Sequence, residues 1–142
     1  MRKIIMGFFI VLVTAAASHA GGISIIANSS FNKNSLTMPQ VKDIYLGKME
    51  VVDGVRIQPI DQKEETIKQD FLKKTLDMSP DDYKSYWVRR VFREGGTPPS
   101  AKGSPEDVIK AVRDGKGSIG YVRDEDIKSK EGIKVLLTIS VP

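Results

Sequence analysis

The chain has 142 residues, a formal net charge of +4, no cysteine and one histidine, His19. The lack of cysteine excludes disulfides and a lipoprotein anchor, so stability has to come from a packed core. The charges are interspersed, with no basic block and no alternation of aromatic and basic residues, and we therefore expect no nucleic-acid partner.

The first 20 residues have the composition of a secretory signal peptide. Two basic residues precede an apolar run over residues 4–17, and Ser18 and Ala20 are small residues of the kind that signal peptidase recognises. We expect cleavage after Ala20, export to the periplasm of a Gram-negative bacterium, and no membrane anchor once the signal peptide is removed.

The expected mature chain, residues 21–142, is long enough for a single domain with a packed core. Removal of Arg2 and Lys3 lowers its formal charge from +4 to +2, and His19 is removed as well. Without histidine and cysteine the chain cannot form a Ser-His or Cys-His nucleophile or an ordinary zinc site. We therefore expect no enzyme activity, no metal and no cofactor.

Residues 23–27 form an apolar run, which predicts a first strand buried on both faces. A loop rich in small hydrogen-bonding side chains follows, and Ser29 and Ser30 come directly after the strand. Hydroxyl groups at such a place can bind a ligand. An ordinary cluster of turn-forming residues is the alternative interpretation.

The next segment has the marks of a helix start. Thr37 can cap the helix, Gln40 completes a capping box, and Gly47 is expected to end it. The Asp53-Gly54 pair then predicts a small hairpin, whose second arm covers residues 55–58.

Asp61, Gln62 and Lys63 precede the following helix. A strand that leads into a helix N-terminus is in principle an anion site, because free backbone N–H groups point outward there. Glu64 and Glu65 lie in the first turn, where they complement the helix dipole themselves and repel an incoming anion.

Ser79 and Ser104 are each followed by proline, which predicts two further capped helices. Aromatic and apolar residues recur at helical spacing in the first of them and indicate a core-facing side: Tyr83, Tyr86, Trp87 and Val91. Arg89 and Arg90 lie on or beside its polar face, and residues 95–99 read as a connector.

Residues 118–122 predict a strand, residues 124–126 an acidic turn or short helix, and residues 133–137 a last strand. Gly117 and Gly120 indicate that neighbouring backbone or a ligand passes close to the first of these strands. Strands that alternate with capped helices predict an α/β fold, with a mixed β-sheet flanked by about four helices.

Several segments resemble the periplasmic phosphate-binding proteins of ABC importers. They are the helix over residues 37–48 with its Ile-Tyr-Leu-Gly ending, the Tyr86-Trp87 pair, the Pro98-Pro99 pair, and the Gly-Ser-Ile-Gly-Tyr-Val strand. The resemblance covers nearly all of the mature chain and is to small, single-lobe members of that family. It implies one lobe of the type II periplasmic-binding-protein fold.

The resemblance also implies binding residues. The family holds phosphate between two lobes with hydroxyl groups, backbone N–H groups, an Asp and an Arg. Ser29 and Ser30 would then be one part of the site, and Asp61, Gln62 and Lys63 another. The Arg and the Ser-Gly-Thr of the family are absent from residues 61–66, where Lys63 offers charge without a bidentate fork.

Two functions therefore stay open. The first is a periplasmic solute-binding protein that binds phosphate or another small oxyanion and works with an ABC permease. The second is a solute-binding-like domain that has lost its ligand site and acts as a periplasmic protein-interaction module.

Overall fold

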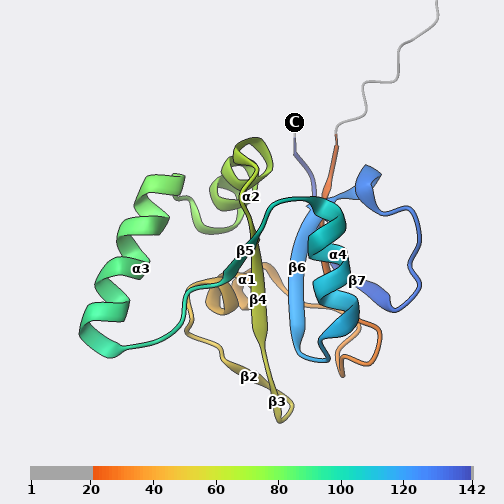
Figure 1. Cartoon of the computed structure of the whole chain (residues 1–142), viewed down its shortest axis with the longest axis horizontal. Coiled ribbons are helices and arrows are strands. Elements are labelled where there is room, and N and C mark those ends of the chain that lie inside the picture. The colour runs from red at the N-terminus through yellow and green to blue at the C-terminus, as the bar shows by residue number, and fades with distance from the viewer. Residues whose placement is uncertain (1–20, 142) are drawn as a thin grey trace, which may run out of the picture.

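The computed structural model describes residues 21–141, so the expected signal peptide lies outside the described residues. Within them the chain forms an α/β fold with four α-helices and a mixed five-stranded sheet (Figure 1), as the sequence predicts. None of these helices combines the length and the apolar character that crossing a bilayer would require.

The main sheet has the strand order β5-β4-β6-β1-β7. Its strands are β1 (Ile23–Asn28), β4 (Gln58–Gln62), β5 (Ser100–Lys102), β6 (Ser118–Arg123) and β7 (Ile133–Ile139). Strand β4 runs parallel to both of its neighbours, whereas β1 runs antiparallel to both of its own. A separate hairpin consists of β2 (Val51–Val52) and β3 (Val55–Arg56).

The α-helices are α1 (Met38–Tyr45), α2 (Glu65–Leu76), α3 (Pro80–Glu94) and α4 (Pro105–Asp114), and a 3₁₀ turn covers Asp124–Asp126. Helices α1, α3 and α4 begin where the capping residues predict, whereas α2 is capped by Glu64, which we expected inside its first turn. Thr37 forms the predicted capping box with Gln40, and Ser79 and Ser104 each cap their helix with the side-chain oxygen. Each of these caps satisfies backbone N–H groups that would otherwise lack a partner.

Two strands of the main sheet were not predicted. The hairpin arm expected over residues 55–58 ends at Arg56, and β4 begins at Gln58 instead. Strand β5 directly follows the expected connector over residues 95–99, in a stretch where we predicted no strand. It has three residues, and its pairing with β4 is a contact between distant parts of the chain, so no local periodicity indicates it.

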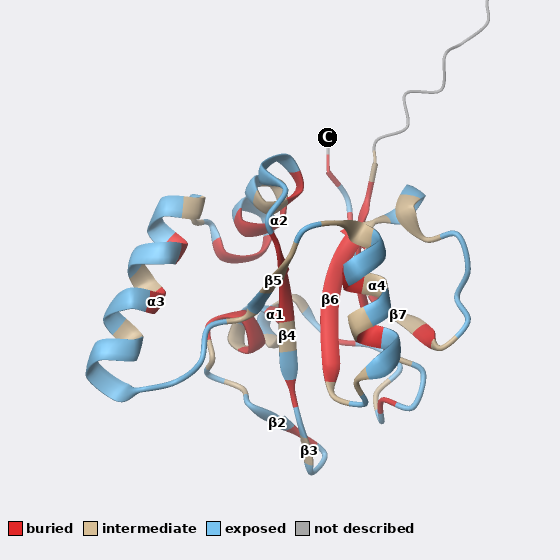
Figure 2. Ribbon diagram, viewed as in Figure 1, coloured by how far each residue is buried: buried red, intermediate tan, exposed pale blue. Residues whose placement is uncertain are grey.

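Helices α1 and α2 pack on one face of the sheet and α4 packs on the other, while α3 lies to the side of the sheet against α1 and α2 (Figures 1 and 2). Alternate residues of β6 divide between the two faces, as the two-residue period of a strand requires. Ile119 and Tyr121 join the cluster under α1, α2 and α3, whereas Val122 joins the cluster under α4.

Close packing explains why glycine occurs at position 120 in β6 and at position 117 just before it. A Cβ atom on Gly120 would lie 2.7 Å from Val108 Cγ1 of α4, and one on Gly117 would overlap the carbonyl oxygen of Arg56. Close approach of the protein's own atoms therefore accounts for both positions without a ligand.

Helix α3 is held by polar anchors at the end of α1. Tyr83, Tyr86 and Arg90 donate hydrogen bonds to three successive carbonyl groups, those of residues 45–47, at 2.7, 2.7 and 2.8 Å. These carbonyls end a helix and have no partner within it. The side of α3 that carries the anchors is thus fixed.

The outer side of α3 is exposed, and this includes Val91, which we expected in the core.

Candidate functional site

The structure places the predicted site residues at two opposite edges of the sheet. Ser29 and Ser30 follow the end of β1, whereas Asp61 and Gln62 end β4. Because β4 runs parallel to β6 and β1 runs antiparallel to it, the ends of β1 and β4 point in opposite directions. The five residues therefore do not form one site.

The serine loop is stabilised by hydrogen bonds within itself. The backbone N–H and the hydroxyl of Ser30 donate to Asn28 Oδ1 at 2.9 and 2.7 Å, and the backbone N–H of Ser29 donates to the carbonyl of Gly132. Both serines are exposed. This is the geometry of an Asx turn, and a ligand-binding role for the two hydroxyls stays a prediction.

The end of β4 carries a buried polar network around Asp61. The Tyr121 hydroxyl and the backbone N–H of Gln62 donate to Asp61 Oδ1, and Lys68 Nζ lies 2.8 Å from Asp61 Oδ2. The amide of Gln62 also donates to the carbonyl of Tyr121, at 2.6 Å. Asp61 and Gln62 are almost fully buried, so this end of the strand is rigid and its polar atoms are satisfied.

The electrostatics of the network keep the Tyr121 hydroxyl protonated. Burial raises the pKa of Tyr121 well above its usual value, and the negative charge of Asp61 raises it further. The hydroxyl therefore serves as a permanent donor to the carboxylate.

A carboxylate of the chain itself occupies the N-terminus of α2. Glu64 caps the helix, and its two oxygens accept from the backbone N–H groups of Thr66 and Ile67, each at 3.0 Å. These two hydrogen bonds lower the pKa of Glu64, and the bond from Ile67 has the larger effect. The anion position that the sequence suggested at this helix end is thus filled from within.

Lys63 lies beside this helix end with an exposed side chain, and its backbone N–H donates to the carbonyl of Lys102 on β5 at 2.9 Å.

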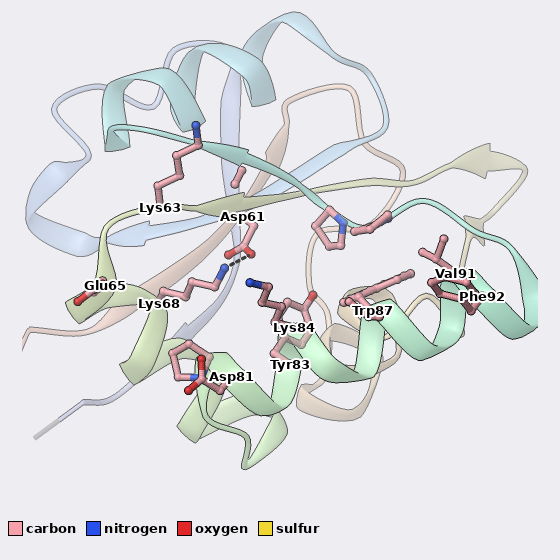
Figure 3. Close-up of a pocket in the computed structure, with 15 residues that line it drawn as sticks. Asp61, Lys63, Glu65, Lys68, Asp81, Tyr83, Lys84, Trp87, Val91 and Phe92 are labelled. Atoms are coloured by element: carbon pink, nitrogen blue, oxygen red, sulfur yellow. Dashed lines mark ion pairs between the residues drawn. The ribbon is translucent and has the colours of Figure 1, made fainter.

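Next to Asp61 the surface opens into a groove between α2, α3 and β5, with a volume of about 590 Å³. Its charged residues gather at one end and its apolar residues at the other (Figure 3). The charged end has Asp61, Lys63, Glu65, Lys68, Asp81 and Lys84, and the apolar end has Trp87, Val88, Val91, Phe92, Pro98 and Pro99.

The apolar end of the groove lies open to solvent. Val88 is 51% exposed, Val91 41% and Phe92 88%. They fall on one side of α3, next to the buried Trp87. Neighbouring apolar side chains exposed beside a groove are typical of binding surfaces in soluble proteins.

A second cavity of about 580 Å³ lies between α1, α3 and α4. Trp87 and Pro98 line both cavities and separate them. The indole nitrogen of Trp87 is buried without a hydrogen-bond partner of good geometry in residues 21–141. It still lies close enough to the Tyr83 hydroxyl to lower the pKa of that group, against the larger effect of burial, which raises it.

Of the residues predicted from the sequence, Asp61 and Lys63 line this groove and Gln62 does not, and the groove residues Lys68 and Lys84 were not predicted. The signal for Lys84 was present, because it precedes Val88 and Phe92 at four-residue spacing on one side of a helix. Nothing in the sequence shows that this side lacks a covering element. In the part of the chain that the structure describes, no group of three or more acidic, histidine or cysteine residues is placed to hold a metal ion.

No family model matches this sequence, and no curated protein matches it. Solved structures do share its fold, each over 82% of this chain. An ABC-type phosphate transport receptor from Vibrio cholerae aligns with a TM-score of 0.62 at 13% identity, and PstS from Borrelia burgdorferi with 0.62 at 14%. A candidate phosphate ABC transporter substrate-binding protein from Clostridium perfringens, with bound phosphate, aligns with 0.65 at 15%.

The aligned region is less than half of each of those proteins: 45%, 46% and 44% of their chains, in the same order. The resemblance seen in the sequence is therefore confirmed at the level of the fold. The chain has the fold of part of a phosphate receptor and spans about half of its length.

Proposed function

We propose that this chain is a periplasmic solute-binding lobe, and that it binds a small anionic solute, phosphate or another oxyanion, in the groove at the end of β4. The observation that carries this proposal is the groove itself. It lies outside the carboxyl end of a parallel strand, which is where α/β sheets bind ligands. Lys84 supplies an ammonium group there that makes no ion pair in residues 21–141.

The shared fold supports the same proposal, because a protein with that fold holds phosphate in its structure. An ABC permease is the partner that such a solute-binding lobe would serve. Periplasmic location follows from the expected signal peptide and is part of the proposal.

The test is thermal unfolding of the exported, processed protein with millimolar phosphate and, separately, sulfate. A ligand at 100 times its Kd adds about 2.7 kcal/mol to stability and raises the Tm by several degrees. We expect such a rise, and we expect Lys84→Met to reduce it while the matched variant Lys74→Met, which changes an exposed lysine of α2 outside the groove, leaves it intact. No rise with either anion would contradict binding of an inorganic oxyanion.

A second candidate function, the protein-interaction module, is favoured by one specific observation. Phe92 is 88% exposed at the end of α3 and has no evident role in stabilising the fold. A photo-crosslinking residue placed at position 92 would capture a periplasmic partner in intact cells. The same residue at position 51, where Val51 is 54% exposed on the hairpin, is the control. A product found equally at both positions would count against a specific interface.

A further inference from the structure

We infer that the groove binds an organic anion that has a single negative charge and an apolar body, with the charge at Lys84 and the body along α3. This inference rests on the proposed solute-binding function and names the class of solute. It excludes inorganic phosphate as the solute that fits the groove best.

The charged end of the groove has one ammonium group in surplus at its centre. The Asp61 carboxylate is already matched by Lys68 at 2.8 Å and by two hydrogen bonds within the protein. The Lys84 ammonium points toward this pair (Figure 3) and makes no ion pair in the described part of the chain. The Lys84 ammonium at the centre of the groove can therefore pair with one negative charge of a ligand.

The remaining charged residues disfavour a second negative charge. Glu65 and Asp81 lie at the outer edge of the charged end, and Lys63 points away from the Asp61–Lys68 pair (Figure 3). The backbone N–H groups at the start of α2, which would suit a phosphate oxygen, already bind Glu64. A monovalent head group such as a carboxylate meets these conditions better than a phosphate dianion does.

The apolar end of the groove requires an apolar body in the ligand. Trp87, Val88, Val91 and Phe92 line it from α3, and Pro98 and Pro99 line it from the connector to β5. Inorganic phosphate would leave all of this surface in contact with water. A hydrocarbon chain or ring would cover it, and the volume of about 590 Å³ is that of a small-molecule site.

The experiment is a titration of the processed protein with the linear carboxylates from butanoate to decanoate, followed by the fluorescence of Trp87, the only tryptophan. We expect affinity to rise about twofold to fourfold for each added methylene, because each one covers apolar surface. Decan-1-ol, which lacks the charge, should bind about tenfold more weakly than decanoate.

Two pairs of variants locate the ligand. Val88→Asp should weaken decanoate binding at least tenfold, whereas Val51→Asp, at an equally exposed valine outside the groove, should not change it. Lys84→Met should weaken decanoate about tenfold and leave decan-1-ol unchanged, and Lys74→Met should change neither. Circular dichroism confirms that each variant is folded.

The outcomes separate this inference from the proposed function. Decanoate binding that grows with chain length and is lost in Val88→Asp supports both. Phosphate binding without decanoate binding overturns the inference and leaves the proposed function standing, whereas binding of neither overturns both. A protein that sediments as a dimer, and as a monomer after Val88→Asp, overturns the inference because a second copy then occupies the groove.

Discussion

The two faces of the sheet hold their helices by different means. Under α4 the contacts are aliphatic, from residues such as Val108, Val112 and Val122, and Gly120 lets the helix approach closely. Under α1, α2 and α3 the core contains aromatic as well as aliphatic side chains, and tyrosine hydroxyls donate to backbone carbonyls. Helix α4 lies directly against β6, β1 and β4, whereas α3 is fixed by hydrogen bonds along one side and lines the groove with another. The groove is present because no other element of the described chain packs against this second side of α3.

The largest effect should come from placing one charge on each face. Val108→Asp puts an unpaired carboxylate into a fully buried position of α4 and should lower the free energy of unfolding by at least about 3 kcal/mol. Val88→Asp, on the outer side of α3, should change it by less than about 0.5 kcal/mol. Urea unfolding measures both. Similar losses in the two variants would mean that α3 is as closely packed as α4.

High pH should act on the aromatic face. Burial raises the pKa values of Tyr45, Tyr83 and Tyr121, so the folded protein keeps protons that the unfolded chain loses above about pH 10. Stability is therefore complete below pH 10 and falls as the pH rises further, by about 1.4 kcal/mol per pH unit for each tyrosine.

Urea unfolding between pH 8 and pH 11 measures this slope. In the variant Tyr83→Phe, the free energy of unfolding should fall less steeply with pH, because one of the three tyrosines no longer contributes. An identical slope in that variant would show that the Tyr83 hydroxyl ionises in the folded protein as readily as in water.

Loss of the anchors should loosen α3 and leave α4 unaffected. Tyr83→Phe combined with Tyr86→Phe removes two hydrogen bonds to the end of α1, each contributing about 1 kcal/mol. Amide hydrogen exchange should become faster in α3 and at residues 45–47, with no change in α4. Faster exchange in both helices would indicate that the two faces unfold together.

The smallest effect should come from the cap of α2. Glu64→Gln weakens the interaction of a charge with an exposed helix end, which contributes a few tenths of a kcal/mol. Since the pKa of Glu64 is lowered in the folded protein, the contribution is present above the unfolded value of about 4.3 and is lost as the pH falls through the folded value. The free energy of unfolding, measured at both pH values, should therefore be lower for Glu64→Gln than for the unaltered protein at pH 7. At low pH the two proteins should have the same free energy of unfolding.

Local chemistry was enough to predict much of this fold. The caps at Thr37, Ser79 and Ser104 depend on residues within one helical turn, and the sequence shows them directly. The first and last strands and the α/β class follow from periodicity. Strand β5 was missed because its three residues gain their structure from β4, about 40 positions away.

The site was less predictable for the same reason. Ser29 follows β1 and Asp61 lies near the end of β4, and only the relative direction of these two strands places them at opposite edges. Lys84 is one of many lysines in the sequence. Its proposed role depends on a groove that forms only when α3 is docked, and no pattern within α3 shows how far this helix lies from the sheet.

The docking of α3 onto carbonyl groups has a consequence for sequence variation. Backbone carbonyls are the same in every residue, so the three anchors place no demand on the side chains that end α1. The constraint falls instead on Gly47, which has φ of +71° and would carry a Cβ atom 2.7 Å from Trp87. Among relatives that keep this helix pair, Leu46 is free to vary as far as the anchors are concerned, while position 47 and Trp87 should change together or not at all.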